Sequence, residues 1–154
     1  MLSERDEGGE LMSTTDFDEV VEHYYRALGE FVKGNSEPVK MMISHREDVT
    51  LANPFGPVVR GWEQVEATMD HAASQLREGE KGGFEIVAKY VTPELAYIVG
   101  LDRTKAKVGA RQDITPFALR VTIIFRPEDG TWKQVHRHAD PITTARPAES
   151  VIQK

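Results

Sequence analysis

The sequence predicts an α+β protein, with three helices in its first half and an antiparallel sheet in its second half. Two observations support this prediction. Apolar residues recur with helical spacing through the first half, and β-rich runs separated by turn signals fill the second half. Helices gathered at one end of a sequence and hairpins at the other are typical of helices packed on an antiparallel sheet. The length of 154 residues fits a single domain.

Three segments of the first half carry helical signals. Apolar side chains between Phe17 and Phe31 recur every three or four residues, and the segment 13–16 offers N-caps before them. Pro38 stands where the first turn of a short second helix tolerates a proline, and helical spacing returns after Gly61. The expected helices cover residues 16–31, 38–43 and 62–76.

The sheet is expected to combine one early strand with a series of hairpins. Breaker-rich segments at 92–94 and 127–130 mark two tight turns in the second half. The segment 53–57, Asn-Pro-Phe-Gly-Pro, is a further turn that follows the early strand. The expected strands are residues 48–52, 84–91, 95–103, 105–112, 116–126 and 131–139.

Composition excludes several classes of function. The chain has no cysteine, which excludes a disulfide framework, a thiolate nucleophile and a cysteine-ligated metal. The net charge of −6, without a long basic stripe, argues against a nucleic-acid partner because Lys and Arg supply most of such affinity. We expect neither a membrane span nor a signal peptide, and so predict a cytoplasmic protein. Residues 1–13 are expected to be a flexible tail, 14–140 the domain, and 141–154 a tail or dimer-facing arm.

Three sequence segments resemble one known superfamily. VVEHYYRAL at residues 20–28 and VTLANPFG at 49–56 resemble the first helix and the strand–turn–helix passage of ketosteroid isomerases. DGTWKQVHRH at 129–138 resembles the closing hairpin of SnoaL-like proteins. Over residues 16–140 the chain therefore resembles the nuclear transport factor 2-like superfamily. The resemblance implies a cystatin-like cone, in which a curved sheet and three helices enclose a pocket for a small apolar molecule, with no metal or cofactor.

The chain departs from the isomerase pattern at two positions. The resemblance places Asn53 where ketosteroid isomerases carry the aspartate that shuttles the substrate proton, and an amide cannot act as that base. It also places Thr122 near the second acid of their oxyanion hole, so that only Tyr24 matches the family's catalytic trio. Steroid isomerisation by that mechanism is therefore not expected.

The last predicted strand carries an unusually polar series of side chains. Strand alternation places Trp132, Gln134, His136, His138 and Asp140 on one face. If that face lines the pocket, His138 is the expected proton carrier, because imidazole titrates near neutral pH. Alternatively, these histidines lie on the outer face or at a dimer contact. A metal site formed by the two histidines and Asp140 is a further alternative that the resemblance does not favour.

Two other polar side chains are open to two interpretations each. Arg120 lies in an otherwise apolar strand, where it can clamp a carboxylate or enolate, or form a structural salt bridge. Whether it shares a face with His138 depends on hairpin register, which a single bulge at the turn, at Asp129-Gly130, would reverse. Tyr24 is either a core aromatic or a phenol donor aimed into the pocket. The expected apolar walls of the pocket are Phe55, Trp62 and Met69.

Three hypotheses about function follow. The first is an acid–base enzyme of isomerase, cyclase or lyase type acting on a small carbonyl compound, with His138 as base and Tyr24 or Arg120 stabilising the oxyanion. The second is a protein that binds a small apolar molecule without converting it, and the third is a non-catalytic association module. Because both faces of the segment 119–125 are apolar, a homodimer is expected. We favour a ligand-binding pocket, in which Asn53, Thr122 and His136 complete the polar contacts.

Overall fold

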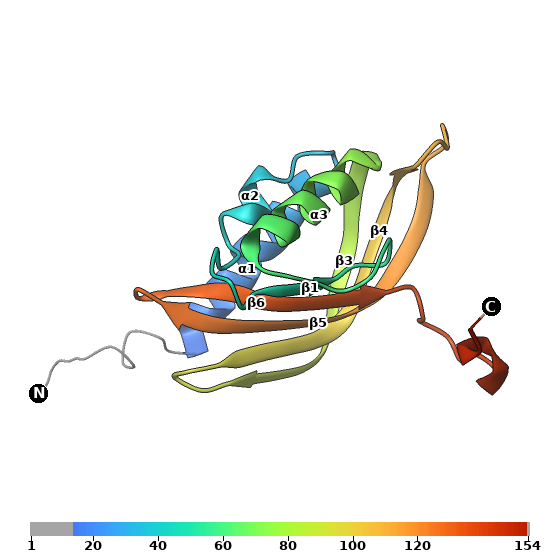
Figure 1. The fold of residues 1–154 in the computed structure, drawn as a ribbon. Helices are drawn as coiled ribbons and strands as arrows, with labels where there is room; N and C mark the ends of the chain where they lie inside the picture. The colour runs from blue at the N-terminus through green and yellow to red at the C-terminus, as the bar shows by residue number, and fades with distance from the viewer. Residues whose placement is uncertain (1–13, 154) are drawn as a thin grey trace, which may run out of the picture.

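Three helices lie on the concave face of one strongly curved sheet in the computed structural model, which describes residues 14–153 (Figure 1). The helices are α1 (Thr14–Phe31), α2 (Glu37–Lys40) and α3 (Trp62–Ser74). The strands are β1 (Thr50–Ala52), β2 (Val59–Arg60), β3 (Leu76–Val91), β4 (Ala96–Val108), β5 (Thr115–Glu128) and β6 (Thr131–Asp140). The predicted α+β class and cystatin-like architecture are confirmed.

The sheet has the order β2-β1-β6-β5-β4-β3 and is mixed rather than wholly antiparallel. Strand β1 runs parallel to β6, with Thr50 opposite His136. All other pairs are antiparallel. The parallel pair brings the turn after β1 next to the C-terminal end of β6, and both contribute residues to the wall of the cavity described below.

Two strand boundaries differ from the sequence prediction. Strand β3 starts at Leu76, directly after α3, whereas the prediction started it at residue 84. Its first half escaped prediction because register shifts on both sides of Lys81 interrupt the regular alternation of side chains. Strand β4 is continuous through Thr104, where two strands were predicted.

The segment that follows β6 lies outside the sheet. The predicted flexible tail, residues 1–13, lies outside the described residues. After β6 the chain runs away from the sheet to a short 3-10 helix, η2 (Ala148–Val151), as Figure 1 shows. No helix in the described part of the chain combines the length and apolar character needed to cross a bilayer.

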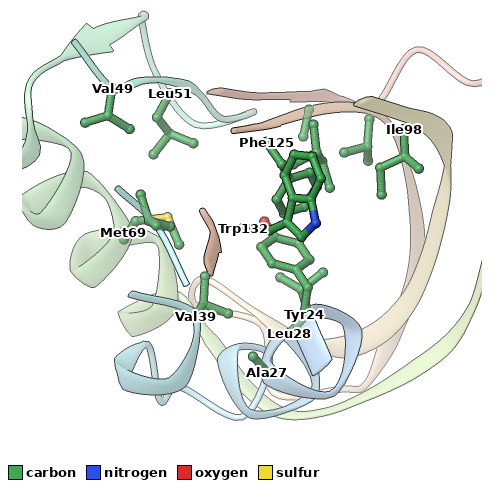
Figure 2. Close-up of a cluster of buried hydrophobic side chains, with 14 of the residues drawn as sticks. Tyr24, Ala27, Leu28, Val39, Val49, Leu51, Met69, Ile98, Phe125 and Trp132 are labelled. Carbon is green, nitrogen blue, oxygen red and sulfur yellow. The ribbon is translucent and has the colours of Figure 1, made fainter. Parts of the chain in front are cut away.

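An aromatic cluster joins α1 to the closing hairpin at the centre of the core (Figure 2). The Phe17 ring lies edge-on to Phe125 and to Trp132, with ring centroids 5.3 Å apart in both pairs. Tyr24 contacts Phe125 in the same way at 5.8 Å. Each such pair contributes about 0.5–1.5 kcal/mol beyond the burial of its surface. The cluster therefore fixes α1 across the β5–β6 hairpin.

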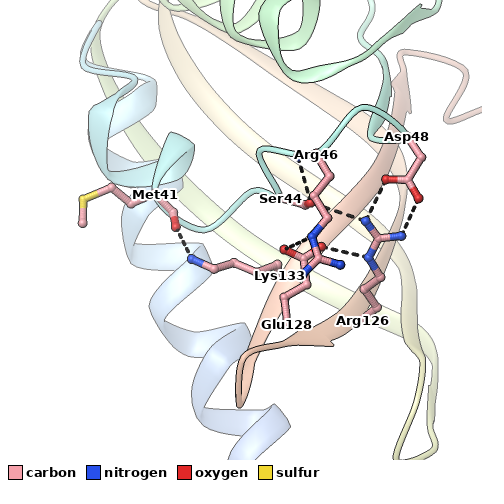
Figure 3. Close-up of polar contacts among 7 residues, drawn as sticks. All are labelled: Met41, Ser44, Arg46, Asp48, Arg126, Glu128 and Lys133. Carbon is pink, nitrogen blue, oxygen red and sulfur yellow. Dashed lines mark hydrogen bonds and ion pairs between the residues drawn. The ribbon is translucent and has the colours of Figure 1, made fainter.

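A polar network holds the loop before β1 against the same hairpin (Figure 3). The Arg126 guanidinium donates two hydrogen bonds of 2.7 Å to the Asp48 carboxylate and one of 2.9 Å to Glu128. Lys133 Nζ donates to the carbonyl oxygen of Met41 at 2.8 Å. The hydrogen bonds from Arg126 lower the pKa of Asp48 to about 2. This network positions β1 and the turn that follows it.

Candidate functional site

A cavity of about 270 Å³ lies between the helices and the concave face of the sheet. Most of its wall is apolar, supplied by α1, α3 and the strands β4 and β5. Representative wall residues are Leu28, Phe31, Met69, Leu76, Phe117 and Leu119. Cavities of this kind, apolar with a few convergent polar groups, are the usual sites for small molecules.

A β-bulge in β6 decides which polar side chains reach this cavity. In the β5–β6 pairing, Phe125 lies opposite Gln134 and Ile124 lies opposite His136, so Val135 is the extra residue of the bulge. Before it, Trp132 and Gln134 are buried in the interior. After it, the alternation is shifted by one residue, and Arg137 lines the cavity instead of the histidines on either side of it. The prediction that Trp132, Gln134, His136, His138 and Asp140 share one face is therefore wrong.

His138 and Arg120 do share a face, but it is the outer face of the sheet. The His138 side chain is 52% exposed, and its Nε2 lies 2.9 Å from Asp140 Oδ2. Arg120 Nε donates to the other oxygen of Asp140 at 2.6 Å. Burial raises the pKa of Asp140, but the hydrogen bonds from Arg120, the Ile142 amide and His138 outweigh it and lower the pKa to about 2. The geometry excludes the predicted roles of His138 as pocket base and Arg120 as pocket clamp, because both belong to this surface cluster.

Three other predicted residues also lie away from the cavity. Thr122 lies opposite His138 on the outer face, and His136 Nδ1 lies 2.8 Å from the Thr50 hydroxyl. Burial lowers the pKa of His136, with a further contribution from His138. Trp62 stacks on His45, with ring centroids 3.8 Å apart, because the first turn of α3 faces the loop before β1. Within residues 14–153, no three His, Asp or Glu side chains are grouped so as to hold a metal ion.

Four predicted site residues do line the cavity: Tyr24, Asn53, Phe55 and Met69. The Tyr24 hydroxyl donates to Gln134 Oε1, and burial raises its pKa to about 12, so the phenol stays protonated at neutral pH. Asn53 Oδ1 accepts the Phe55 amide at 2.9 Å, which fixes the turn after β1. The structure therefore brings these four residues together in the wall of one cavity.

Four polar side chains of the cavity were missed in the sequence: Lys81, Asp102, Thr104 and Arg137. Asp102 and Thr104 occupy the same buried, every-second positions of β4 as its buried apolar residues. This pattern could have revealed them. Lys81 lies among glycines and charged residues that gave no strand signal, and the bulge concealed Arg137.

These side chains form a buried ion cluster on one wall of the cavity. Lys81 Nζ donates to the Asp102 carboxylate and, at 2.8 Å, to the Thr104 hydroxyl. Arg137 Nη2 lies 3.8 Å from the other oxygen of Asp102. Burial lowers the pKa of Lys81 from its ordinary value of 10.5, although the Asp102 carboxylate acts in the opposite direction. With both cations protonated and Asp102 ionised, the cluster carries one excess positive charge.

A family model described as a SnoaL-like domain matches residues 17–143. Three solved structures are similar in fold. The first, an NTF2-like superfamily protein from Salmonella enterica subsp. enterica serovar Typhimurium str. LT2, has 17% identity and a TM-score of 0.72, covering 88% of this chain and 97% of that one. A ketosteroid isomerase-like protein from Erwinia carotovora atroseptica SCRI1043 has 15% identity and a TM-score of 0.68, covering 84% and 96%. An NTF2-like protein with a cystatin-like fold from Novosphingobium aromaticivorans has 15% identity and a TM-score of 0.62, covering 91% and 90%. No curated protein sequence matches the chain.

Proposed function

The chain belongs to the SnoaL-like domain family, and from this premise we propose that it binds a small, mostly apolar molecule in the cavity. The observation that carries the proposal is the 270 Å³ cavity itself, with its apolar walls and its few polar side chains gathered on one side. Apolar walls supply most of the binding free energy for such a ligand, and the polar groups orient it.

Binding is favoured over acid–base catalysis because of the state of the polar groups. Among the described residues that line the cavity, Asp102 is the one carboxylate, and two cations lie beside it. Lys81 donates a hydrogen bond to this carboxylate, so one of its oxygens is already engaged. The Tyr24 hydroxyl already donates a hydrogen bond to Gln134, and His138 lies on the other side of the sheet. The arrangement therefore suits a receptor better than a proton shuttle.

The proposal includes a homodimer formed through the outer face of the sheet. That face carries Tyr97, Val99 and Leu101 of β4, which are only partly buried, and the exposed ring of Tyr90 stacks on Tyr97 at 5.6 Å. A contiguous apolar patch of this kind on a sheet is a common site of self-association. The cavity lies on the opposite, concave side of the sheet, so this interface would not occupy it.

Titration with indole tests the binding proposal, because indole is neutral and small enough for the cavity. We expect saturable binding by calorimetry or by ligand-detected NMR. Leu119→Trp should abolish this binding, since Leu119 lines the cavity. Ile114→Trp is the matched control, because Ile114 is half exposed before β5 and does not line the cavity. Equal indole binding by both variants, or absence of binding to the unmodified protein, would contradict the proposal.

A further inference from the structure

We propose that the ligand of the cavity is an organic carboxylate, and that Arg137 is the receptor for its charged group. This inference rests on the proposed function, because it names the class of ligand for the same cavity. It is carried by three observations: the unfilled hydrogen-bonding capacity of Arg137, the charge of the ion cluster, and the apolar wall beside it.

The Arg137 guanidinium lies in the cavity wall, and its Nε has no hydrogen-bond partner among the described residues. Its side chain is only 11% exposed, and this Nε is buried. The carboxylate oxygen of Asp102 is 3.8 Å from Nη2, which is too long for a hydrogen bond. A guanidinium carries five N–H donors in a planar fork that matches a carboxylate. Arg137 can therefore donate hydrogen bonds to a carboxylate bound in the cavity.

The charge of the cluster selects an anion over a neutral group. Lys81 and Asp102 neutralise each other through their direct contact, with side chains 9% and 4% exposed. The remaining charge is that of Arg137, and a buried cation is costly unless it is paired. A bound carboxylate would supply the missing charge and accept two parallel hydrogen bonds from the guanidinium. Lys81 and Asp102 then act as positioning residues, since Asp102 holds Lys81 in the wall and orients Arg137 electrostatically.

The rest of the cavity sets the size and character of the ligand. Its 270 Å³ equals the liquid volume of about nine water molecules. Phe31, Phe117 and Leu119 contribute apolar wall, which inorganic anions do not require. A monocarboxylate with one aromatic ring or a short alkyl chain fits both requirements, so 3-phenylpropanoate is a suitable probe.

Calorimetric titrations with 3-phenylpropanoate and with its neutral amide, 3-phenylpropanamide, test the inference. We expect the unmodified protein to bind the carboxylate at least about tenfold more tightly than the amide, because charge-assisted hydrogen bonds are the stronger kind. Arg137→Gln should weaken binding of the carboxylate by about tenfold or more and so remove this preference. Arg120→Gln, the matched change on the outer face, should preserve it. Arg137→Lys, which retains the charge without the fork, should lie between the two.

Each outcome supports or overturns one of the two proposals. Equal affinity for carboxylate and amide, or a preference for the carboxylate that survives in Arg137→Gln, would overturn the role of Arg137 as carboxylate receptor. Indole binding in the same experiments would still support the cavity as a ligand site. If Arg137→Gln does not fold, the carboxylate-to-amide comparison on the unmodified protein and on Arg137→Lys decides the question. Competition by inorganic phosphate as strong as that by the carboxylate would overturn the organic ligand class. If indole and both probes fail to bind, the proposed function itself is wrong.

Discussion

Replacing Asp102 by Asn should destabilise the protein more than almost any other change of similar size. The substitution preserves the shape of the side chain but removes the negative charge between Lys81 and Arg137. It raises the net charge of the buried cluster from one to two, with all three side chains at most 11% exposed. Removing one partner of a buried ion pair typically costs about 3–5 kcal/mol, because the remaining charge is left uncompensated.

The expected loss is large compared with the whole stability of a domain, which is about 5–15 kcal/mol. At about 2–4 °C per kcal/mol for a chain of this size, the melting temperature should fall by about 6–20 °C. Urea unfolding monitored by circular dichroism at pH 7 measures the change in free energy. The double variant Asp102→Asn/Arg137→Gln restores a single excess charge and should recover much of the loss. A loss below about 1 kcal/mol, or a double variant no more stable than the single one, would refute the reasoning.

Three further predictions concern the core, the acid limb of stability and self-association. Trp132→Ala should cost about 3–5 kcal/mol in urea unfolding, since the ring is fully buried against Phe17, whereas Tyr90→Ala on the exposed face should cost far less. The pKa of Asp48 is about 2 in the folded state against an ordinary 3.8, so the stabilisation it gives is complete above pH 3.8 and is lost as the pH falls toward 2. In Asp48→Asn, the free energy of unfolding should therefore fall less steeply between pH 3.8 and pH 2. An unchanged pH dependence in this range would contradict the Arg126 contact. Light scattering at micromolar concentration should give about twice the 17.3 kDa of one chain, and a monomer mass would exclude the dimer.

The fold could be predicted because its signals are local. Helical spacing, the turn at 53–57 and the hairpin signal at 127–130 each depend on neighbouring residues, and together they specify the α+β class. The resemblance to SnoaL-like proteins was carried by the closing hairpin, and the family match over residues 17–143 confirms it. The parallel pairing of β1 with β6 was missed because it joins segments more than eighty residues apart.

The candidate site was predicted only in part, because it depends on strand register rather than on local pattern. Tyr24, Asn53, Phe55 and Met69 lie on elements whose positions the pattern specified, and they line the cavity. The histidines were assigned to the wrong face because strict alternation was assumed through Val135. The sequence hypothesis named the possibility of a bulge, but placed it at the turn rather than within the strand.

The bulge at Val135 decides which side chains of β6 face the cavity, although the residues themselves stay the same. In His136-Arg137-His138, imidazole and guanidinium side chains alternate, so the direction of the first residue decides which kind reaches the interior. A chain with the same three residues on a regular strand would present two titratable rings to its cavity and turn the permanent cation outward. One unpaired residue thus places a guanidinium, rather than two imidazoles, in the interior without any substitution. Hairpins of this kind can look alike in sequence while their equivalent positions face opposite sides of the sheet.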